Sequence, residues 1–149
     1  MLKIIKSKKK LINILQIDKP FLMIDSFKNK RKGYSGIAEK IITKNDWYFK
    51  SHFLNNPIFP GTLQTEAMLQ SIIIILNIKN KFAKKNYMIT KINTNHFSSI
   101  KGEGKLKILS KIISHRRGAI EAISNIQFNK ENVSEGKFKF FCPSDLIIK

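Results

Sequence analysis

Residues 55 to 77 read NNPIFPGTLQTEAMLQSIIIILN, a loop rich in turn formers that leads into a long apolar segment. Pro57, Pro60 and Gly61 exclude regular helix or strand from residues 55–61, because proline lacks an N–H donor and glycine favours turns. Apolar residues then dominate from Thr62 to about Asn77, which predicts a helix of several turns. Because this helix would have almost no polar face, it must be buried on most sides. In a chain of 149 residues, one sheet wrapped around the helix would supply that burial.

Shorter elements precede this loop. We expect a short helix over residues 8–16 and a mostly apolar strand over residues 21–27. Residues 28–33 read KNKRKG and predict a basic turn at the surface. A second strand is expected over residues 34–43.

The second half of the sequence alternates between apolar and polar residues with a period of two. Turns separate the alternating segments, most clearly at residues 115–118, which read HRRG. This pattern is typical of an antiparallel sheet that is covered on one face. The sequence therefore predicts a single α+β domain, residues 1–149, in which a curved sheet holds one central helix. The residues expected on the covered face are Leu106, Ile108, Ile112, Ile120, Ala122, Ile126, Phe128, Phe138 and Phe140.

Composition narrows the functional classes. Cys142 is the single cysteine, which excludes an internal disulfide and a multi-cysteine metal site, and the three histidines lack metal-ligand spacing. The basic start of the chain carries only a short apolar run without a cleavage site, and no run is long enough to span a membrane. We therefore expect a cytoplasmic protein. The net charge of +18 has two explanations, attraction to an acidic partner or a lysine-rich composition without a specific role.

Two ionisable side chains stand out on either side of the Pro-Gly turn. Glu66 falls in the first turns of the most apolar helix, where burial would raise the pKa of its carboxyl group and suit it to act as an acid. His52 precedes the proline-rich loop, and an imidazole is a suitable base for removing a proton beside a carbonyl. The helix that begins after Pro60 and Gly61 would offer free backbone N–H groups to a developing oxyanion. From the residues alone, a packed structural histidine and a glutamate that only favours the helix dipole remain alternatives.

Residues 52–70 read HFLNNPIFPGTLQTEAMLQ and closely resemble the signature GHFPGxPIxPGVLxxEAMAQ of the FabZ-type hydroxyacyl-carrier-protein dehydratases. The spacing between histidine and glutamate is the same in both. Outside this motif the resemblance extends over nearly the whole chain. The other similar segments are residues 20–25 and 40–49 and, more loosely, residues 87–97, 115–118 and 134–138.

The sequence departs from the family pattern around the histidine. Ser51 replaces the usual glycine before it, and Leu54 and Asn55 replace a Pro-Gly pair after it. These changes suit a specialised relative that acts on an unusual hydroxyacyl group as well as they suit the enzyme of fatty acid elongation. Glutamate at position 66, where the related isomerising dehydratase has aspartate, argues against that second activity.

The resemblance implies a hotdog fold and the removal of water from a (3R)-hydroxyacyl thioester on an acyl carrier protein, in fatty acid or related acyl-chain biosynthesis. It implies that His52 takes the α-proton, that Glu66 handles the departing hydroxyl group, and that N–H groups near Gly61 and Thr62 polarise the thioester carbonyl. It also implies a homodimer in which each active site combines the histidine and glutamate of two subunits, often assembled as three dimers. No metal or organic cofactor is implied beyond the phosphopantetheine arm of the substrate. Further substrate contacts are expected from Phe59, Met68 and Leu69.

An acidic acyl carrier protein would give the positive charge a purpose. Two other activities of the same fold remain open, acyl-thioester hydrolysis and a non-catalytic subunit that binds a carrier protein or an acyl chain. A nucleic-acid-binding role is disfavoured, because no RNA-binding motif is present and the basic residues are not interleaved with aromatic ones. His96 and His115 lie outside the motif and are expected to be structural or surface residues. The residues expected to dock the carrier protein are Lys30, Arg31, Lys32, Lys84, Lys85, Arg116 and Arg117.

Overall fold

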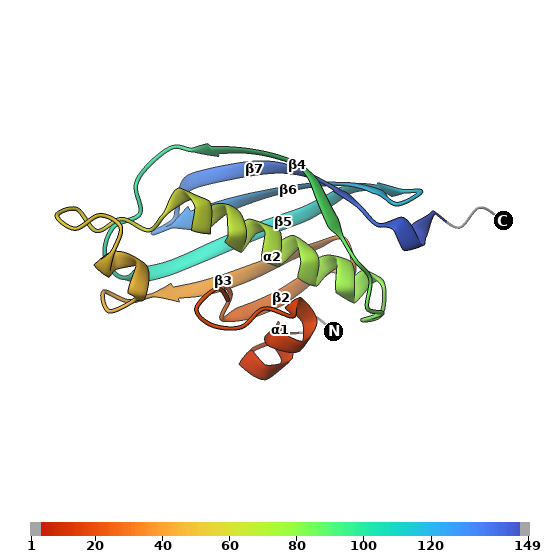
Figure 1. Ribbon diagram of the computed structural model, residues 1–149, viewed down its shortest axis with the longest axis horizontal. Coiled ribbons are helices and arrows are strands. Elements are labelled where there is room, and N and C mark those ends of the chain that lie inside the picture. Colours follow the sequence, from red (N-terminus) through yellow and green to blue (C-terminus); the bar gives the residue numbers. More distant parts are fainter. Residues whose placement is uncertain (1–3, 147–149) are drawn as a thin grey trace.

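A seven-stranded antiparallel sheet curves around one long helix in the computed structural model, which describes residues 4–146 (Figure 1). The strand order is β1-β2-β3-β5-β6-β7-β4, so β1 and β4 form the two edges. The expected α+β arrangement with a central helix is therefore confirmed. In chain order the elements are β1 (Ile4–Ile5), α1 (Lys8–Leu15), β2 (Ser26–Arg31), β3 (Ser35–Ile42), the 3-10 helix η1 (Trp47–Lys50), α2 (Gly61–Lys79), β4 (Met88–His96), β5 (Gly104–Arg116), β6 (Ala119–Phe128), β7 (Glu131–Phe141) and the 3-10 helix η2 (Pro143–Asp145).

Helix α2 lies across the concave face of the sheet (Figure 1). Thirteen of its 19 residues are buried, which is the pattern of a core helix rather than of a surface helix. The burial of each isoleucine or leucine in this run stabilises the fold by roughly 1.5–3 kcal/mol. The one buried serine of α2, Ser71, accepts a hydrogen bond from Ser110 of β5 at 2.9 Å, and Ser110 also contacts Ser124 of β6 at 2.8 Å. The hydroxyl groups of these three serines are thus hydrogen-bonded to one another between helix and sheet.

The alternation in the second half of the sequence corresponds to strands β5, β6 and β7, as expected. Ile108 pairs with Ile126, and Ala122 pairs with Phe138, so apolar side chains from three strands meet on the face that covers α2. All nine side chains predicted for this face are buried, which confirms the prediction: Leu106, Ile108, Ile112, Ile120, Ala122, Ile126, Phe128, Phe138 and Phe140.

The prediction for the first strand was wrong by about five residues. The apolar residues 22–24 are buried but pair with no strand, and β2 runs instead from Ser26 to Arg31 through the segment predicted as a turn. The lysines of this segment suggested a turn, yet Phe27 and Asn29 alternate with them and are buried. The turn itself is shorter and contains Gly33, whose positive φ of 70° favours glycine.

Two smaller differences concern the strand ends. Strand β5 continues to Arg116, so the predicted turn at residues 115–118 contracts to Arg117 and Gly118. Strand β1 was not expected, and it pairs Ile5 with Phe27 at the edge of the sheet. The short helix expected over residues 8–16 is present as α1.

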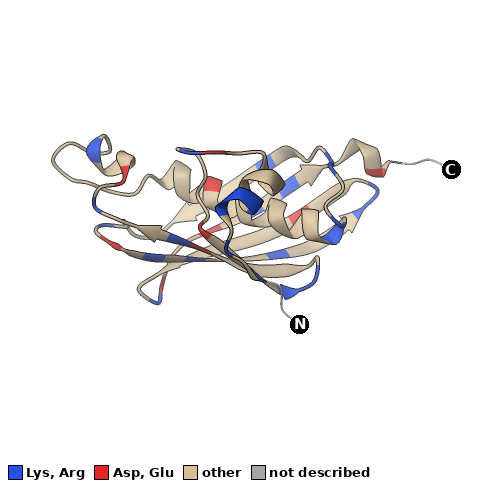
Figure 2. Cartoon of the chain, turned by 90° about the horizontal axis from the view of Figure 1, so that it is seen from below, with Lys and Arg blue, Asp and Glu red and all other residues tan. Residues whose placement is uncertain are grey.

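Basic residues are spread over most of the elements and several loops rather than gathered on one of them (Figure 2). Within residues 4–146, no helix is both long enough and apolar enough to cross a membrane. The same residues contain no group of three or more His, Cys, Asp or Glu side chains arranged to hold a metal ion.

Candidate active site

His52 is held in the loop between β3 and α2 by its own backbone. Its N–H donates to the carbonyl of Tyr48 at 2.8 Å, and its carbonyl accepts from the N–H of Ile58 at 2.8 Å. The ring nitrogen Nδ1 lies 3.1 Å from the carbonyl oxygen of Ile58, so Nδ1 carries the proton. In the neutral ring Nε2 is then an unprotonated nitrogen available as a base. The ring packs on Phe53, with 3.8 Å between centroids, and the His52–Phe53 peptide bond is cis.

A buried aromatic cluster packs against this loop on its core side. Tyr48 and Phe59 are fully buried and meet edge to face with 4.7 Å between ring centroids. The Tyr48 hydroxyl donates to Asp46 at 2.6 Å, and burial together with this carboxylate raises the pKa of Tyr48 well above its ordinary value. The N–H of Phe59 donates to Ile100 at 2.9 Å, which ties the loop to the segment between β4 and β5. Phe59, expected as a substrate contact, thus lies in the core and is fully buried.

The first turn of α2 carries free N–H groups, as expected. Pro60 occupies the N-cap position and has no side-chain cap, and its carbonyl accepts from Leu63 and Gln64. The N–H groups of Gly61 and Thr62 have no acceptor within the described part of the chain. Two unpaired donors at the positive end of a 19-residue helix form a suitable site for an oxyanion.

Glu66 lies on α2 beyond these donors and is held by Gln70, one turn further along. Gln70 donates from Nε2 to Glu66 Oε1 at 2.8 Å. The orientation of this amide is fixed, because Gln70 Oε1 accepts from the N–H of Met23 at 2.8 Å while Nε2 also donates to the carbonyl of Phe21 at 2.8 Å. The segment before β2, although not a strand, therefore positions the carboxyl group of Glu66.

The environment of Glu66 favours its protonated form. Burial raises the pKa of its carboxyl group above the ordinary value, and the hydrogen bond from Gln70 only partly opposes this effect. The sequence-based expectation of a raised pKa is therefore confirmed in direction. Among residues 4–146 no hydrogen bond joins Glu66 to His52, so a single chain does not assemble the two groups into one contact.

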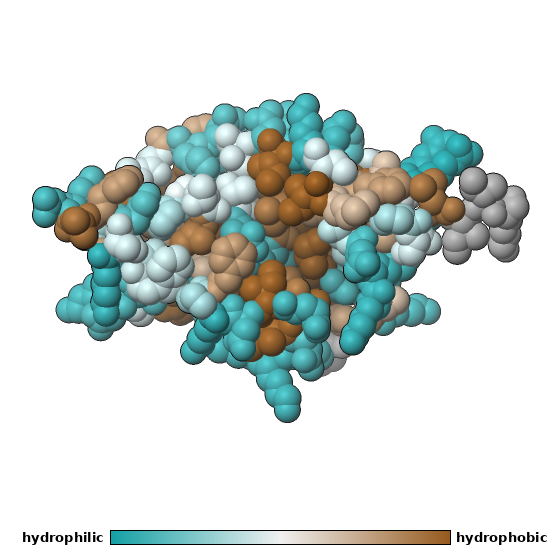
Figure 3. Space-filling model, viewed as in Figure 1, coloured by the Kyte–Doolittle hydropathy of each residue, from teal (hydrophilic) through white to brown (hydrophobic). Residues whose placement is uncertain are grey.

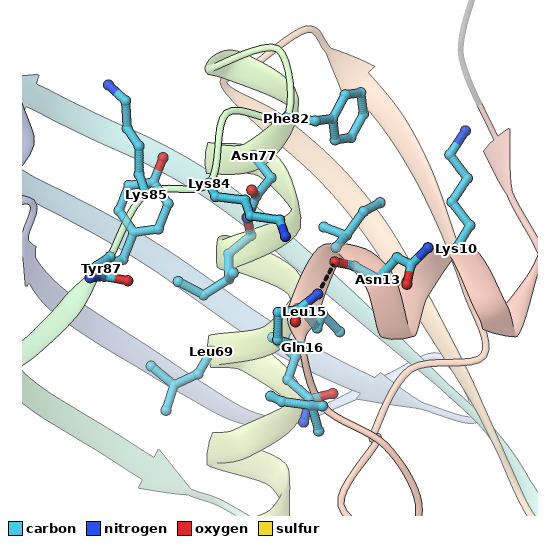
Figure 4. Close-up of a pocket in the computed structure, with 15 residues that line it drawn as sticks. Lys10, Asn13, Leu15, Gln16, Leu69, Asn77, Phe82, Lys84, Lys85 and Tyr87 are labelled. Atoms are coloured by element: carbon cyan, nitrogen blue, oxygen red, sulfur yellow. Dashed lines mark hydrogen bonds between the residues drawn. The ribbon is translucent and has the colours of Figure 1, made fainter.

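A cavity of about 650 Å³ opens beside α2, between α1 and the segment that precedes β4 (Figure 4). Leu69, Gln70 and Ile73 line it from α2, so one wall contains the residue that positions Glu66. Leu69, whose contact with substrate stays a prediction, therefore faces this cavity. Met68 is fully buried in the core and is not among the lining residues.

The basic residues expected to dock a partner lie in three separate places. Lys30, Arg31 and Lys32 belong to the β2–β3 hairpin, where the Arg31 guanidinium lies 4.7 Å from the centre of the Tyr34 ring. Arg116 and Arg117 lie at the β5–β6 turn. Lys84 and Lys85 line the cavity, although Lys85 also forms an ion pair with Asp145.

Two residues near the site were not assigned a role from the sequence. Gln70 could have been found, because a buried amide in an apolar helix needs specific partners. His96 is exposed, as expected of a surface residue, but its ring also lies against Gly61 at the start of α2. Nothing in the sequence links positions 61 and 96. His115 is a structural residue, as expected, in contact with Asp145.

Solved structures share this fold. The dehydratase heterocomplex ApeI:P from Xenorhabdus doucetiae superimposes with a TM-score of 0.72 at 15% identity, over 89% of this chain and 90% of that chain. A hypothetical thioesterase from Streptococcus pneumoniae, solved with coenzyme A, gives a TM-score of 0.63 at 12% identity, over 91% and 96%. This likeness to solved structures identifies the curved sheet around one buried helix as a hotdog fold.

Sequence comparisons define the family within that fold. The FabA-like domain matches residues 15–137. A protein of Caldicellulosiruptor bescii named 3-hydroxyacyl-[acyl-carrier-protein] dehydratase FabZ is 27% identical over 88% of this chain and 94% of its own length. A protein of the same name from Thermoanaerobacter pseudethanolicus is 32% identical over 85% and 89%. The chain belongs to the FabA-like family, and its resemblance to the FabZ-type dehydratases is confirmed.

Proposed function

We propose that the protein removes water from a (3R)-hydroxyacyl thioester on an acyl carrier protein and forms the trans-2-enoyl thioester, in the cytoplasm. The observation that carries this proposal is that the chain holds both a candidate base, His52, whose Nε2 is free, and a candidate acid, Glu66, whose carboxyl pKa is raised by burial. A base and an acid of these kinds are what α-proton removal and hydroxyl departure require. The two relatives named as 3-hydroxyacyl-[acyl-carrier-protein] dehydratases support this substrate and a role in fatty acid or related acyl-chain biosynthesis.

In the proposed reaction, His52 Nε2 takes the proton from the α-carbon, and the electron pair moves onto the thioester oxygen. The N–H groups of Gly61 and Thr62 stabilise the negative charge that develops there. When the carbonyl forms again, the C–O bond to the β-hydroxyl breaks and Glu66 gives that oxygen its proton. One enoyl thioester and one water leave, and a proton returns from His52 to Glu66 through solvent. Both proton transfers use side chains, so no metal or organic cofactor is needed besides the phosphopantetheine arm.

The acyl chain would occupy the cavity beside α2. Gln70 lines this cavity and holds Glu66, which places the reacting end of the chain next to the carboxyl group. Leu69 and Ile73 provide apolar surface further along. Lys84 at the same cavity and the basic β2–β3 hairpin are the proposed docking residues for an acidic carrier protein.

The proposed active unit is a homodimer formed through β4. Strand β4 has β7 on one side and an unpaired edge on the other. Ile89 and Ile92 lie opposite the buried Phe140 and Phe138, so they face inward, yet they are 48% and 46% exposed. Figure 3 shows hydrophobic side chains gathered in the middle of the molecule, on the side that Figure 1 also presents. Pairing of β4 with the same strand of a second copy would cover them and bring His52 of one subunit towards Glu66 of the other.

The function is tested with a short (3R)-hydroxyacyl carrier protein, followed by mass spectrometry. Wild type is expected to remove one water, and His52→Ala and Glu66→Gln are expected to leave the substrate intact. Free hydroxy acid as the product would instead identify a thioesterase, the alternative favoured by the structural neighbour from Streptococcus pneumoniae. Binding of the carrier protein without any change in mass, over several chain lengths, would indicate a non-catalytic subunit.

The dimer is tested with Ile92→Asp, measured by light scattering and by dehydration rate. The variant is expected to be a folded monomer with little activity, because a carboxylate cannot be buried at the new interface. Ile123→Asp is the matched control, since Ile123 is 40% exposed on the outer face of β6. A variant at position 92 with the wild-type mass and rate would rule out the β4 interface. The light scattering of wild type also distinguishes a dimer from three associated dimers.

A further inference from the structure

His96 brings a second imidazole, besides His52, to the region where α2 begins. It is the last residue of β4 and lies opposite Ser134 of β7, which is fully buried, so His96 faces the helix. A Cβ added at Gly61 would stand 3.3 Å from both Nε2 and Cδ2 of this ring. Glycine therefore allows the edge of the ring to rest against the backbone. The Nε2 edge thus lies against Gly61, whose N–H is one of the two proposed to hold the thioester oxygen.

The contacts of His96 determine which of its nitrogens is free. Nδ1 lies 3.3 Å from Gln64 Oε1, and the Gln64 amide nitrogen makes a long hydrogen bond of 3.5 Å to the carbonyl of Phe59. Gln64 thus presents its oxygen to the ring, and Nδ1 donates to it. Partial burial lowers the pKa of His96, which keeps the ring neutral at neutral pH. Nε2 then offers a lone pair that has no donor within residues 4–146.

We propose that His96 Nε2 accepts a hydrogen bond from the amide N–H of the carrier arm that lies nearest to the thioester. This inference rests on the proposed function. In a phosphopantetheine arm, two methylene groups and the sulfur separate that amide nitrogen from the thioester carbonyl. With the carbonyl oxygen at Gly61 and Thr62, the amide N–H reaches the adjacent end of β4, where the lone pair of His96 lies.

The bond gives His96 a role that differs from the role of His52. His52 acts on the α-carbon, whereas His96 binds the amide N–H on the far side of the thioester sulfur and performs no proton transfer. It is a specificity-determining residue that selects thioesters with a pantetheine-type amide over thioesters that lack one. A neutral acceptor also has no attraction for a phosphate group, so the contact is specific for the amide end of the arm.

The inference is tested with two matched substrates, a (3R)-hydroxyacyl thioester of N-acetylcysteamine and the same compound with an ester oxygen in place of the amide N–H. In wild type, loss of the N–H is expected to raise KM about three- to tenfold, the effect of one hydrogen bond, with kcat unchanged. In His96→Ala the two substrates are expected to have the same KM, equal to that of the ester substrate in wild type. His96→Gln restores an acceptor and is expected to recover part of the preference.

Asn95→Ala is the matched control, because Asn95 is the neighbouring residue of β4 and is exposed. It is expected to keep the wild-type ratio of KM values. An unchanged ratio in His96→Ala, or equal KM values in wild type, would overturn the role of His96 while leaving dehydration intact. If wild type dehydrates neither of the two matched substrates nor the carrier-bound one, the proposed function itself is overturned.

Discussion

Two sets of a histidine and a carboxyl group, His115 with Asp145 and His52 with Glu66, have different kinds of partners in this protein. His115 Nε2 and Asp145 Oδ2 lie 2.8 Å apart, and Lys85 forms an ion pair with the same carboxylate. Within residues 4–146, the side chains of His52 and Glu66 have only neutral hydrogen-bond partners, a backbone carbonyl and an amide. The first pair fastens η2 to β5, whereas groups left without a charged partner are available to a substrate.

Burial acts on both carboxyl groups, with opposite net results. At Asp145 burial raises the pKa, but the hydrogen bonds and charges of Lys85 and His115 outweigh it, and the pKa is lowered. At Glu66 burial raises the pKa, and the hydrogen bond from Gln70 is too weak to reverse it. Neighbouring cations thus hold Asp145 as a structural anion, whereas no cation opposes the effect of burial on the pKa of Glu66.

The largest expected effect is on the dehydration rate, which should depend on Glu66 but not on Asp145. Glu66→Gln keeps the shape of the side chain but removes its proton, so the dehydration rate is expected to fall about 10²- to 10⁴-fold, the usual contribution of a general acid. Asp145→Asn is expected to retain more than half of the wild-type rate. Initial rates at saturating substrate measure both variants. Comparable losses in the two would remove the distinction between a catalytic and a structural pair.

A smaller effect is expected when the support of Glu66 is removed. Gln70→Met keeps an unbranched side chain of similar size but deletes the hydrogen bonds to Glu66, Met23 and Phe21. The rate is expected to fall about tenfold to 100-fold, as positioning is lost. The pKa of Glu66 is also expected to rise further, because the bond from Gln70 lowers it. The alkaline limb of the pH–rate profile should therefore move to higher pH, a shift that a purely structural role for Gln70 would not produce.

The sequence was sufficient to predict those parts of the protein that depend on local pattern. The alternation around Ile108 and Ile126 reports which side of each strand is buried, and the run of isoleucines in α2 requires burial on most sides. The motif likewise singled out His52 and Glu66, because their spacing within one loop and helix is local, and their catalytic roles stay a prediction. Burial of Glu66 among apolar neighbours was enough to predict the direction of its pKa shift.

Features that depend on contacts between distant residues were not predicted. The amide of Gln70 accepts a hydrogen bond from the N–H of Met23, 47 residues away, and the ring of His96 on β4 reaches Gly61 at the start of α2. The first strand was misplaced for a related reason. Residues 22–24 are apolar because they pack against the core beside α2, and their hydrophobicity resembled that of a strand.

The internal pair is expected to matter for stability rather than for turnover. Asp145→Asn removes the charge that Lys85 and His115 share, and the free energy of unfolding at neutral pH is expected to fall by about 1–2 kcal/mol. Glu121→Gln is the control, because the ion pair of Glu121 with Lys139 is exposed and should contribute less than about 0.5 kcal/mol. Urea denaturation measures both variants. Equal losses would mean that the Asp145 cluster is no more than a surface ion pair.

The smallest effect is the pH dependence of stability, and its sign should differ between the two carboxyl groups. Asp145 has a lowered pKa, so its contribution is complete above the ordinary value of 3.8 and is lost as pH falls, and the deficit of Asp145→Asn should shrink in acid. Glu66 has a raised pKa, so its ionisation costs stability as pH rises past the ordinary value of 4.5. Glu66→Gln should then unfold at a slightly higher temperature than wild type at neutral pH and at the same temperature in acid. Melting curves of the three proteins between pH 3 and pH 8 measure these differences. Parallel behaviour of the two variants would show that both carboxylates are held by charge, and Glu66 would then be unsuited to supply a proton at neutral pH.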